Sequence, residues 1–396
     1  MDNDRLVSNT GQPSANPIDD VAAAVAAALI DPVDFPSLTL SVVPGDTVAV
    51  AVDRELPQVG SVTAAVIATL LDANVAAEQI LVVLADANDE SRIVEMLPTD
   101  IVAAIRIATH DPADKNALAY LAASAAGDPI YVNRIICDAD FAIPIGRVVI
   151  DTVTGEYTVT GGVFPSFADI GTQQRLATRT ADGEPDTSKR EVDEAQWLLG
   201  ARFTVQLISG AGDTLLQAMA GDIDSVRAKV AGLADSLWNF DVPDQAALVV
   251  AAIPGDASQQ TWANVARAVT ASARIVQDDG DQPAAIAICT DLEHPPGPAT
   301  RLIIGCASLE EAESLITEGE FVDADVAVQL IRVLRHTKIY LLSQLAENIV
   351  EDLGMAYVAD ASEVNNLCQR HATCTLVANA QHAWPSLAGT SSAVNS

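Results

Sequence analysis

The chain has 396 residues, of which 49 % are hydrophobic, and its formal net charge is −33. The apolar content is typical of a packed protein and excludes general disorder, and the length favours two domains over a single core. So acidic a surface repels phosphate, which argues against nucleic acids and anionic membranes as partners.

The hydrophobic pattern in the first half of the chain predicts alternating strands and helices. Residues 1–18 are polar and are expected to form a disordered tail, without the features of a signal or transit peptide. Near-continuous Val, Ile and Leu runs separated by helical segments predict a parallel sheet covered on both faces. Strands are expected at 46–53, 80–86, 105–109, 130–133 and 141–146, with helices at 61–74 and 115–125.

Beyond residue 162 the pattern loosens and then resumes. A polar surface loop is expected at 178–190 and a linker at 239–244, and a second alternating series begins at Ala247. Strands are predicted there at 284–290, 302–305, 338–342, 356–359 and 373–378. The expected fold class is α/β, with two α/β domains, mostly parallel sheets and an interdomain cleft. The domains span 19–238 and 244–385, followed by a disordered tail at 386–396.

The cysteines indicate a reducing compartment. Five of them are scattered through apolar runs, which favours buried free thiols and a cytoplasmic protein. Cys368, His371 and Cys374 have the spacing of metal ligands, but no fourth ligand is evident, so no metal site is expected. The sequence also lacks the phosphate loop, the dinucleotide fingerprint, the GxSxG elbow and the HExxH motif.

One segment carries a family resemblance. Residues 109–162 contain the pair His110-Asp111, the run G-x-P-I-x-V-N-R from Gly127 to Arg134, and later Gly161-Gly162. With the helix EVDEAQWLLG that follows, this ordered set resembles the N-terminal domain of the nickel-dependent lactate racemases, over most of residues 40–275. The resemblance implies a nickel-pincer nucleotide that takes a hydride from a 2-hydroxy acid, while two histidines move the hydroxyl proton.

The residues that would perform this chemistry are replaced. Leu56 stands where the family has the arginine that grips the substrate carboxylate, and Arg54, two positions away, is expected to point elsewhere. Asn88 and Asp151 occupy the places of the two catalytic histidines. Val163-Phe164-Pro165 follows the glycine pair in place of a nearby lysine, and residues 166–182 contain no histidine. We therefore expect neither the nickel-pincer cofactor nor another one.

Several residues remain candidates for a site. Asp151 and His110 are the catalytic candidates, and Arg267, Asn264, Arg134 and Asn88 are the substrate-binding candidates. Gly161 and Gly162 are the cofactor-contacting candidates, because glycine lets the backbone approach a ligand closely.

Each candidate also has a structural interpretation. The His110 ring could be held by a loop carboxylate, Arg134 could pair with Asp138 or Asp140, and the glycines could belong to a plain hairpin. Asn264 and Arg267 resemble a Gln and a Lys of the family, and Arg267 suits bidentate binding of a carboxylate.

Two functions follow. One is a divergent lactate-racemase-like protein, an isomerase if it is active, that acts on a small hydroxy or carboxylic acid in the cleft. The other is a protein of the same fold that binds a small carboxylate, or regulates through it, without catalysis. The pattern of replaced residues favours the second slightly. Oligomeric state is left open by the sequence.

Overall fold

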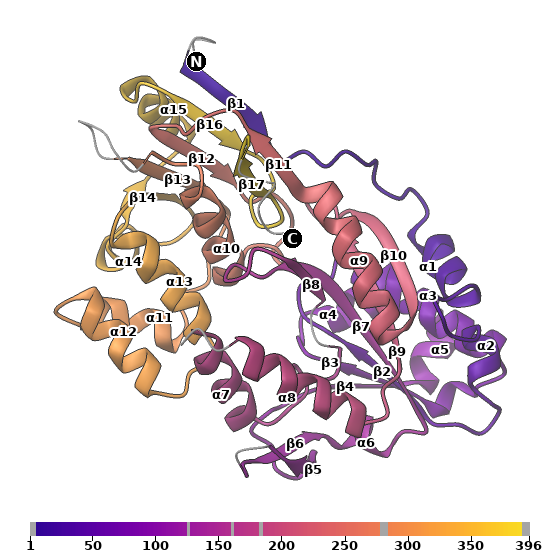
Figure 1. The fold of residues 1–396 in the computed structure, drawn as a ribbon. Coiled ribbons are helices and arrows are strands. Elements are labelled where there is room, and N and C mark those ends of the chain that lie inside the picture. The colour runs from indigo at the N-terminus through magenta and orange to yellow at the C-terminus, as the bar shows by residue number, and fades with distance from the viewer. Residues whose placement is uncertain (1–4, 125–126, 160–161, 182–184, 278–283, 390–396) are drawn as a thin grey trace.

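The computed structural model describes residues 5–124, 127–159, 162–181, 185–277 and 284–389. It contains two large, mostly parallel sheets with helices packed on them (Figure 1), which confirms the predicted α/β class. None of the helices within these residues is both long enough and apolar enough to cross a membrane. The predicted domain boundaries stay predictions.

The sheet of the first half has the strand order β10-β9-β7-β2-β3-β4, and β8 pairs with β7. Its neighbours are parallel except for the antiparallel pairs β10–β9 and β7–β8. The strands are β2 (Val48–Val52), β3 (Ile80–Leu84), β4 (Arg106–Thr109), β7 (Phe141–Ile150), β8 (Tyr157–Val159), β9 (Phe203–Ser209) and β10 (Leu215–Asp222).

The sheet of the second half has the order β1-β16-β12-β13-β14-β15 and is parallel throughout. Its strands are β1 (Leu6–Thr10), β12 (Leu248–Ala252), β13 (Ala285–Cys289), β14 (Lys338–Leu342), β15 (Ala356–Val358) and β16 (Cys374–Val377). Two small pairs complete the strands: β5 (Leu118–Ala123) with β6 (Pro129–Asn133), and β11 (Asn239–Val242) with β17 (Trp384–Leu387).

Helices cover both sheets. The first half has α1 (Val21–Ile30), α2 (Leu38–Ser41), α3 (Val59–Asp72), a 3-10 turn (Ala77–Gln79), α4 (Asp89–Val94), α5 (Thr99–Ala104), α6 (Arg134–Asp138), α7 (Ile170–Ala181), α8 (Pro185–Leu198) and α9 (Ile223–Trp238). The second half has α10 (Trp262–Ala273), α11 (Pro298–Gly305), α12 (Leu309–Glu318), α13 (Ala324–Leu334), α14 (Glu347–Asp352) and α15 (Ala361–Arg370).

Strand β2 shows why the sheets are buried on both faces. Its five residues, VAVAV, are all fully buried. The valines at 48, 50 and 52 face the core under α1 and α3, whereas Ala49 and Ala51 face a second core that contains Phe164 and Phe167. Alternate residues of a strand point to opposite faces, so small alanines on one side leave room for the large rings there.

The largest apolar core crosses between the halves. It contains Val148, Ile150 and Ile208 of the first sheet together with Val249 and Ile288 of the second. Because such a core is close-packed, the two sheets are held in one arrangement by the same burial that stabilises each of them.

The N-terminal residues differ from the expected tail. Residues 6–10 form β1, the edge strand of the second sheet, beside β16 (Figure 1). Their side chains are polar or only half-buried, so the hydrophobic pattern gives no strand signal. Backbone hydrogen bonds to β16 hold the segment instead.

Other expected elements also differ. The segment 115–125 was expected to be helical, but 118–123 is β5, since pairing with β6 overrides the helix propensity of its alanines and leucines. The expected strand 302–305 is the end of α11, because short apolar runs fit either structure.

Two expected loops are ordered elements. The polar segment 178–190 holds the end of α7 and the start of α8, with 182–184 outside the described residues. The expected linker 239–244 begins with β11, which pairs with β17, and β17 itself takes up the first residues of the expected C-terminal tail.

The turn after β1 yields a stability prediction. Gly11 has φ +85°, and a Cβ placed there would lie 1.8 Å from the carbonyl oxygen of Ala378. Gly45 has φ +109° with no atom within 4 Å of such a Cβ. Gly45→Ala therefore adds only backbone strain, about 1 kcal/mol, whereas Gly11→Ala also forces β1 away from β16 and costs roughly 2–4 kcal/mol. Urea denaturation of both variants measures the difference; equal losses would contradict the close packing at Gly11.

Candidate functional site

A cavity of about 300 Å³ lies between the two halves of the chain. The loop after β2, the segment before α7, and helices α7 and α8 supply one side, and the start of α13 supplies the other. Its lining residues are Arg54, Pro165, Ser166, Gln173, Leu176, Ala177, Thr180, Val192, Val322 and Asp325. A cavity of this volume suits a small molecule, at the lower end of the usual range.

Arg54 supplies the positively charged side chain among the described residues that line this cavity. Its exposed side chain makes no hydrogen bond or ion pair with any residue that the structure describes, while its backbone N–H donates to Asp53 Oδ1 at 2.8 Å. The next residue, Glu55, has φ +57°, a left-handed conformation that is rare outside glycine and turns the chain sharply. This turn sends Arg54 and Glu55 to different surroundings. Arg54 therefore faces the candidate cavity, whereas the sequence predicted that it would point elsewhere.

Glu55 joins the two halves electrostatically. Its carboxylate pairs with Arg147 of β7 and, at 3.6 Å, with Arg267 of α10. Burial by itself would raise the pKa of Glu55, but the charges of Arg147 and Arg267 and hydrogen bonds from Thr261 and Arg267 together hold it below the ordinary value. Burial in turn lowers the pKa of Arg147 to about 10, against the charge of Glu55. Both groups stay ionised at neutral pH.

Arg267 and Asn264 lie together on α10. Thr261 caps this helix, its hydroxyl accepting from the N–H of Asn264 at 3.1 Å. The buried amide of Asn264 accepts from Arg267 and donates to the carbonyl of Gln259 at 2.7 Å. Arg267 is thus held against Glu55 and Asn264 and is not among the residues lining the cavity, so its predicted role as the carboxylate anchor stays untested.

Asp325 supplies the carboxyl group among the described residues that line the cavity. It is the second residue of α13, is half-buried, and forms no ion pair within the described part of the chain. Burial raises the pKa of Asp325 above its ordinary value, although backbone N–H groups of Val326 and the charge of Arg267 oppose the rise. Its sequence context does not single it out, because an acid in the first turn of a helix is usually a solvated partner of the helix dipole.

His110 belongs to the frame of the first half. Its ring is buried, Nε2 lies 3.0 Å from the carbonyl oxygen of Ala168, and Nδ1 lies 3.2 Å from Nδ2 of Asn133. The only tautomer that fits both partners donates from Nε2 and accepts at Nδ1. Burial lowers the pKa of His110, which keeps the ring neutral. Asn133 also caps α6 through the N–H of Ile135, so the pair fixes a turn, with no free nitrogen for proton transfer.

Arg134 has a structural place as well. Its guanidinium donates to the carbonyl oxygens of Asn116 at 3.3 Å and Leu118 at 2.5 Å. It therefore bonds to the β5 segment and not to Asp138 or Asp140, as one alternative had it.

The remaining candidates lie apart from the cavity. Asp151 closes the β7–β8 hairpin, where its carboxylate accepts from the N–H groups of Val153 and Thr154. Asn88 precedes α4 at the surface, with its N–H bonded to Asp86. Gly162 has φ +61° and packs against Pro144, so its conformation serves local packing. Gly161 lies outside the described residues. None of these residues lines the cavity.

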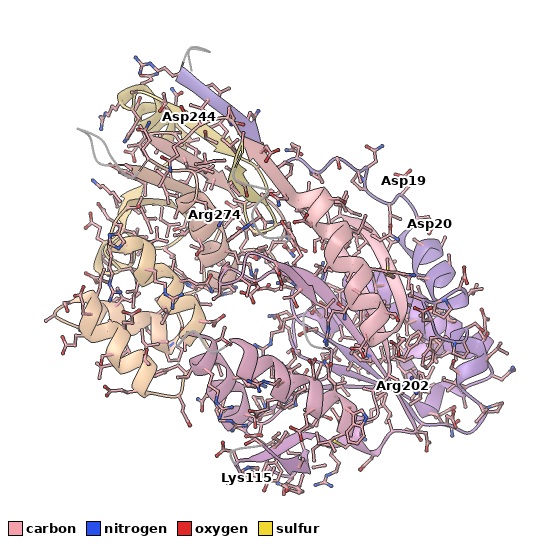
Figure 2. The ribbon with its side chains drawn as sticks, viewed as in Figure 1. Asp19, Asp20, Lys115, Arg202, Asp244 and Arg274 are labelled. Atoms are coloured by element: carbon pink, nitrogen blue, oxygen red, sulfur yellow. The ribbon has the colours of Figure 1, made fainter. Side chains whose placement is uncertain are left out.

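Residues 163–181, after the glycine pair, contain no lysine and no histidine, the residue types that the resemblance implies for holding a nickel-pincer nucleotide. Val163 and Phe164 are buried in the apolar core, where the family has its lysine nearby. Figure 2 shows Lys115 at the outer edge of the structure, beside β5 and β6. Among the described residues, no three His, Cys, Asp or Glu side chains are grouped to hold a metal. Soft metal sites need imidazole or thiolate donors, and both ring nitrogens of His110 are already hydrogen-bonded.

Sequence reasoning missed two groups near the contact of the halves. Arg147 sits in the middle of the apolar strand FAIPIGRVVI, and an arginine in such a run signals a buried ion pair. His382 lies in the turn before β17, stacked 5.2 Å from Trp238. Burial, followed by the charges of Arg147 and Arg267, lowers its pKa strongly. Nothing in its local sequence distinguishes it.

The Glu55 pair leads to a prediction with a pH signature. Glu55→Gln removes the carboxylate beside two arginines and should lower the free energy of unfolding at pH 7 by roughly 1.5–3 kcal/mol. The folded-state pKa of Glu55 lies below its ordinary value of 4.5. The stabilisation is therefore complete above that value and is lost as pH falls towards the folded-state pKa.

Urea denaturation at pH 7 and pH 4 measures this effect. The difference between wild type and Glu55→Gln should shrink at the lower pH. A difference that stays constant would mean that Glu55 acts only through packing.

Comparison with known proteins gives a family match. The model of the lactate racemase N-terminal domain matches residues 1–172. No match was found among curated proteins.

Two solved structures resemble nearly the whole chain. The chain resembles the lactate racemase apoprotein from Thermoanaerobacterium thermosaccharolyticum, with a TM-score of 0.77 and 14 % identity over 97 % of this chain and 96 % of that one. It also resembles a protein from Thermotoga maritima, with a TM-score of 0.68 and 14 % identity over 94 % of this chain and all of the other. At this identity the structures show the fold alone. Residues 1–172 thus match the lactate racemase N-terminal domain, and the whole chain has the fold of the lactate racemase apoprotein.

Proposed function

We propose that this lactate-racemase-like protein binds a small carboxylic acid in the cavity between its halves, without nickel-pincer racemisation. The observation that carries the proposal is Arg54, an unpaired guanidinium within the described residues that faces a cavity of ligand size. Arginine binds carboxylates through two parallel hydrogen bonds, which give both affinity and orientation.

The lining supports binding over racemisation. Inverting a carbon centre requires groups that act on both of its faces. The titratable side chains among the cavity's described lining residues are Arg54 and Asp325. An arginine keeps its proton at neutral pH, so Asp325 is left as a single acid or base.

A second candidate function rests on that carboxyl group. Burial raises the pKa of Asp325, which moves it towards the range in which a carboxylic acid can exchange protons at neutral pH. A residual isomerase acting on a 2-hydroxy acid would use it. Chiral chromatography of a hydroxy-acid panel incubated with the protein separates this candidate from pure binding.

The test of the binding proposal is calorimetric titration with short aliphatic carboxylic acids, including their 2-hydroxy and 2-amino derivatives. Arg54→Leu should weaken the binding of every ligand in the series by roughly 10- to 100-fold, because it removes a charge-assisted contact. Arg202→Leu is the matched control, since Arg202 is an exposed arginine on another face (Figure 2). If no acid binds, or if Arg54→Leu binds as well as wild type, the proposal fails.

Metal content gives an independent check. Protein produced in nickel-supplemented medium should contain no stoichiometric nickel by elemental analysis and no pyridinium nucleotide by mass spectrometry. Dialysis against a chelator should leave carboxylate binding unchanged. Stoichiometric nickel, or binding lost on chelation and restored by nickel, would overturn the view that the cofactor is absent.

A further inference from the structure

The cavity presents two opposite charges that do not neutralise each other. Arg54 and Asp325 both line it, and no ion pair within 4 Å joins them or ties either one to another described residue. Burying an unpaired charge is costly, and the half-buried carboxylate of Asp325 bears part of this cost, whereas the guanidinium of Arg54 is exposed. Their separation leaves room for a ligand between them.

The carboxylates of Asp323 and Asp325 differ in their hydrogen bonds. Asp323 lies two residues earlier and accepts from the N–H groups of Ala299 and Thr300 and from the Thr300 hydroxyl, at 3.0–3.1 Å. It thereby fixes the start of α11 to the start of α13. The side chain of Asp325 has no such bond to another element within the described residues, and it faces the cavity.

We infer that the ligand is an amino carboxylate, whose carboxylate binds Arg54 and whose ammonium group binds Asp325. This inference rests on the proposed function and adds the second charged group of the ligand. Separated positive and negative side chains are complementary to a zwitterion, because one such molecule supplies a carboxylate for Arg54 and an ammonium group for Asp325.

Charge distinguishes an amine from a hydroxyl group here. A ligand with only a carboxylate would bring a second negative charge near Asp325, and a hydroxyl group would supply one neutral hydrogen bond. An ammonium group supplies a charge-assisted bond and removes the cost of keeping Asp325 ionised in a half-buried place. The contacts of Arg54 are the same for all three ligands, so selectivity is expected to come from Asp325.

The rest of the lining favours a short aliphatic side chain. Its apolar members are Pro165, Leu176, Ala177, Val192 and Val322. The amide nitrogen of Gln173 is already bonded to the carbonyl oxygens of Ser166 and Ala168, at 3.2 and 2.9 Å. Such a wall accommodates methyl and methylene groups and gives little to a polar side chain.

The experiment compares ligands that share a skeleton. Racemic 2-amino, 2-hydroxy and unsubstituted carboxylic acids of three to six carbons are titrated into the full chain at pH 7 by calorimetry. The 2-amino acid should bind at least 10-fold more tightly than its 2-hydroxy and unsubstituted counterparts at the best chain length. In Asp325→Asn this preference should disappear, while binding of the unsubstituted acid is kept or improved.

Asp100→Asn is the matched control, because Asp100 is also the second residue of a helix, α5, but is exposed and absent from the cavity lining. It should keep the preference. Thermal melting of the free variants shows that each is folded.

Each outcome has one meaning. Equal binding of all three ligand types, or a preference for amines that survives Asp325→Asn, overturns the inference and leaves the proposed carboxylate site standing. Binding of none of the acids by wild type overturns both. Butylamine, titrated alone, should bind weakly, and tight binding of it would remove Arg54 from the inference.

Discussion

A guanidinium group buried in an apolar strand must have a negative partner, and at Arg147 this requirement connects the two halves. The strand can carry the arginine because Glu55 lies against it, on a loop bent by a left-handed residue. Glu55 also reaches Arg267 of α10, so the second half contributes to the same charge balance. Arg54, the residue before Glu55, faces the cavity. The candidate site therefore lies directly beside this charge network.

A fold of this kind can be kept while most of its residues change. Burial of aliphatic side chains on both faces of two sheets depends on residue volume and polarity, so the core tolerates extensive substitution at 14 % identity. Catalytic chemistry depends on particular atoms. Val163 and Phe164 pack in the core near the place where the family has its lysine, and the buried His110 serves a turn. Fold and activity are separable for this reason.

Much of the fold was predictable because its strands correspond to hydrophobic runs in the local sequence. The runs that became β2 and β3 are continuous and apolar, and such runs specify buried parallel strands. Strand β1 has no such pattern, since its order comes from pairing with β16 more than 360 residues later in the sequence. Strand β1 and the β5–β6 pair depend on strand pairing, which the hydrophobic pattern of a short stretch of sequence does not reveal.

The site was less predictable than the fold. A resemblance directs attention to positions aligned with catalytic residues, and of these Asp151, Asn88 and Gly162 lie outside the lining of the cavity. The cavity arises where Arg54 and the start of α13 meet across the halves. Whether an arginine faces a cavity depends on the backbone and side-chain dihedrals of the loop that carries it, which sequence patterns do not report.

The position of β1 has a consequence for how the molecule is made. The ribosome releases β1 more than 360 residues before its partner β16. The second sheet therefore cannot acquire this edge until β16 has been synthesised, and the first half folds while β1 is still unpaired. Non-local pairing of this kind slows folding and leaves an unpaired strand exposed to other chains in the meantime. A protein cut between its halves would face the same problem permanently, because the second sheet would be separated from the strand that completes it.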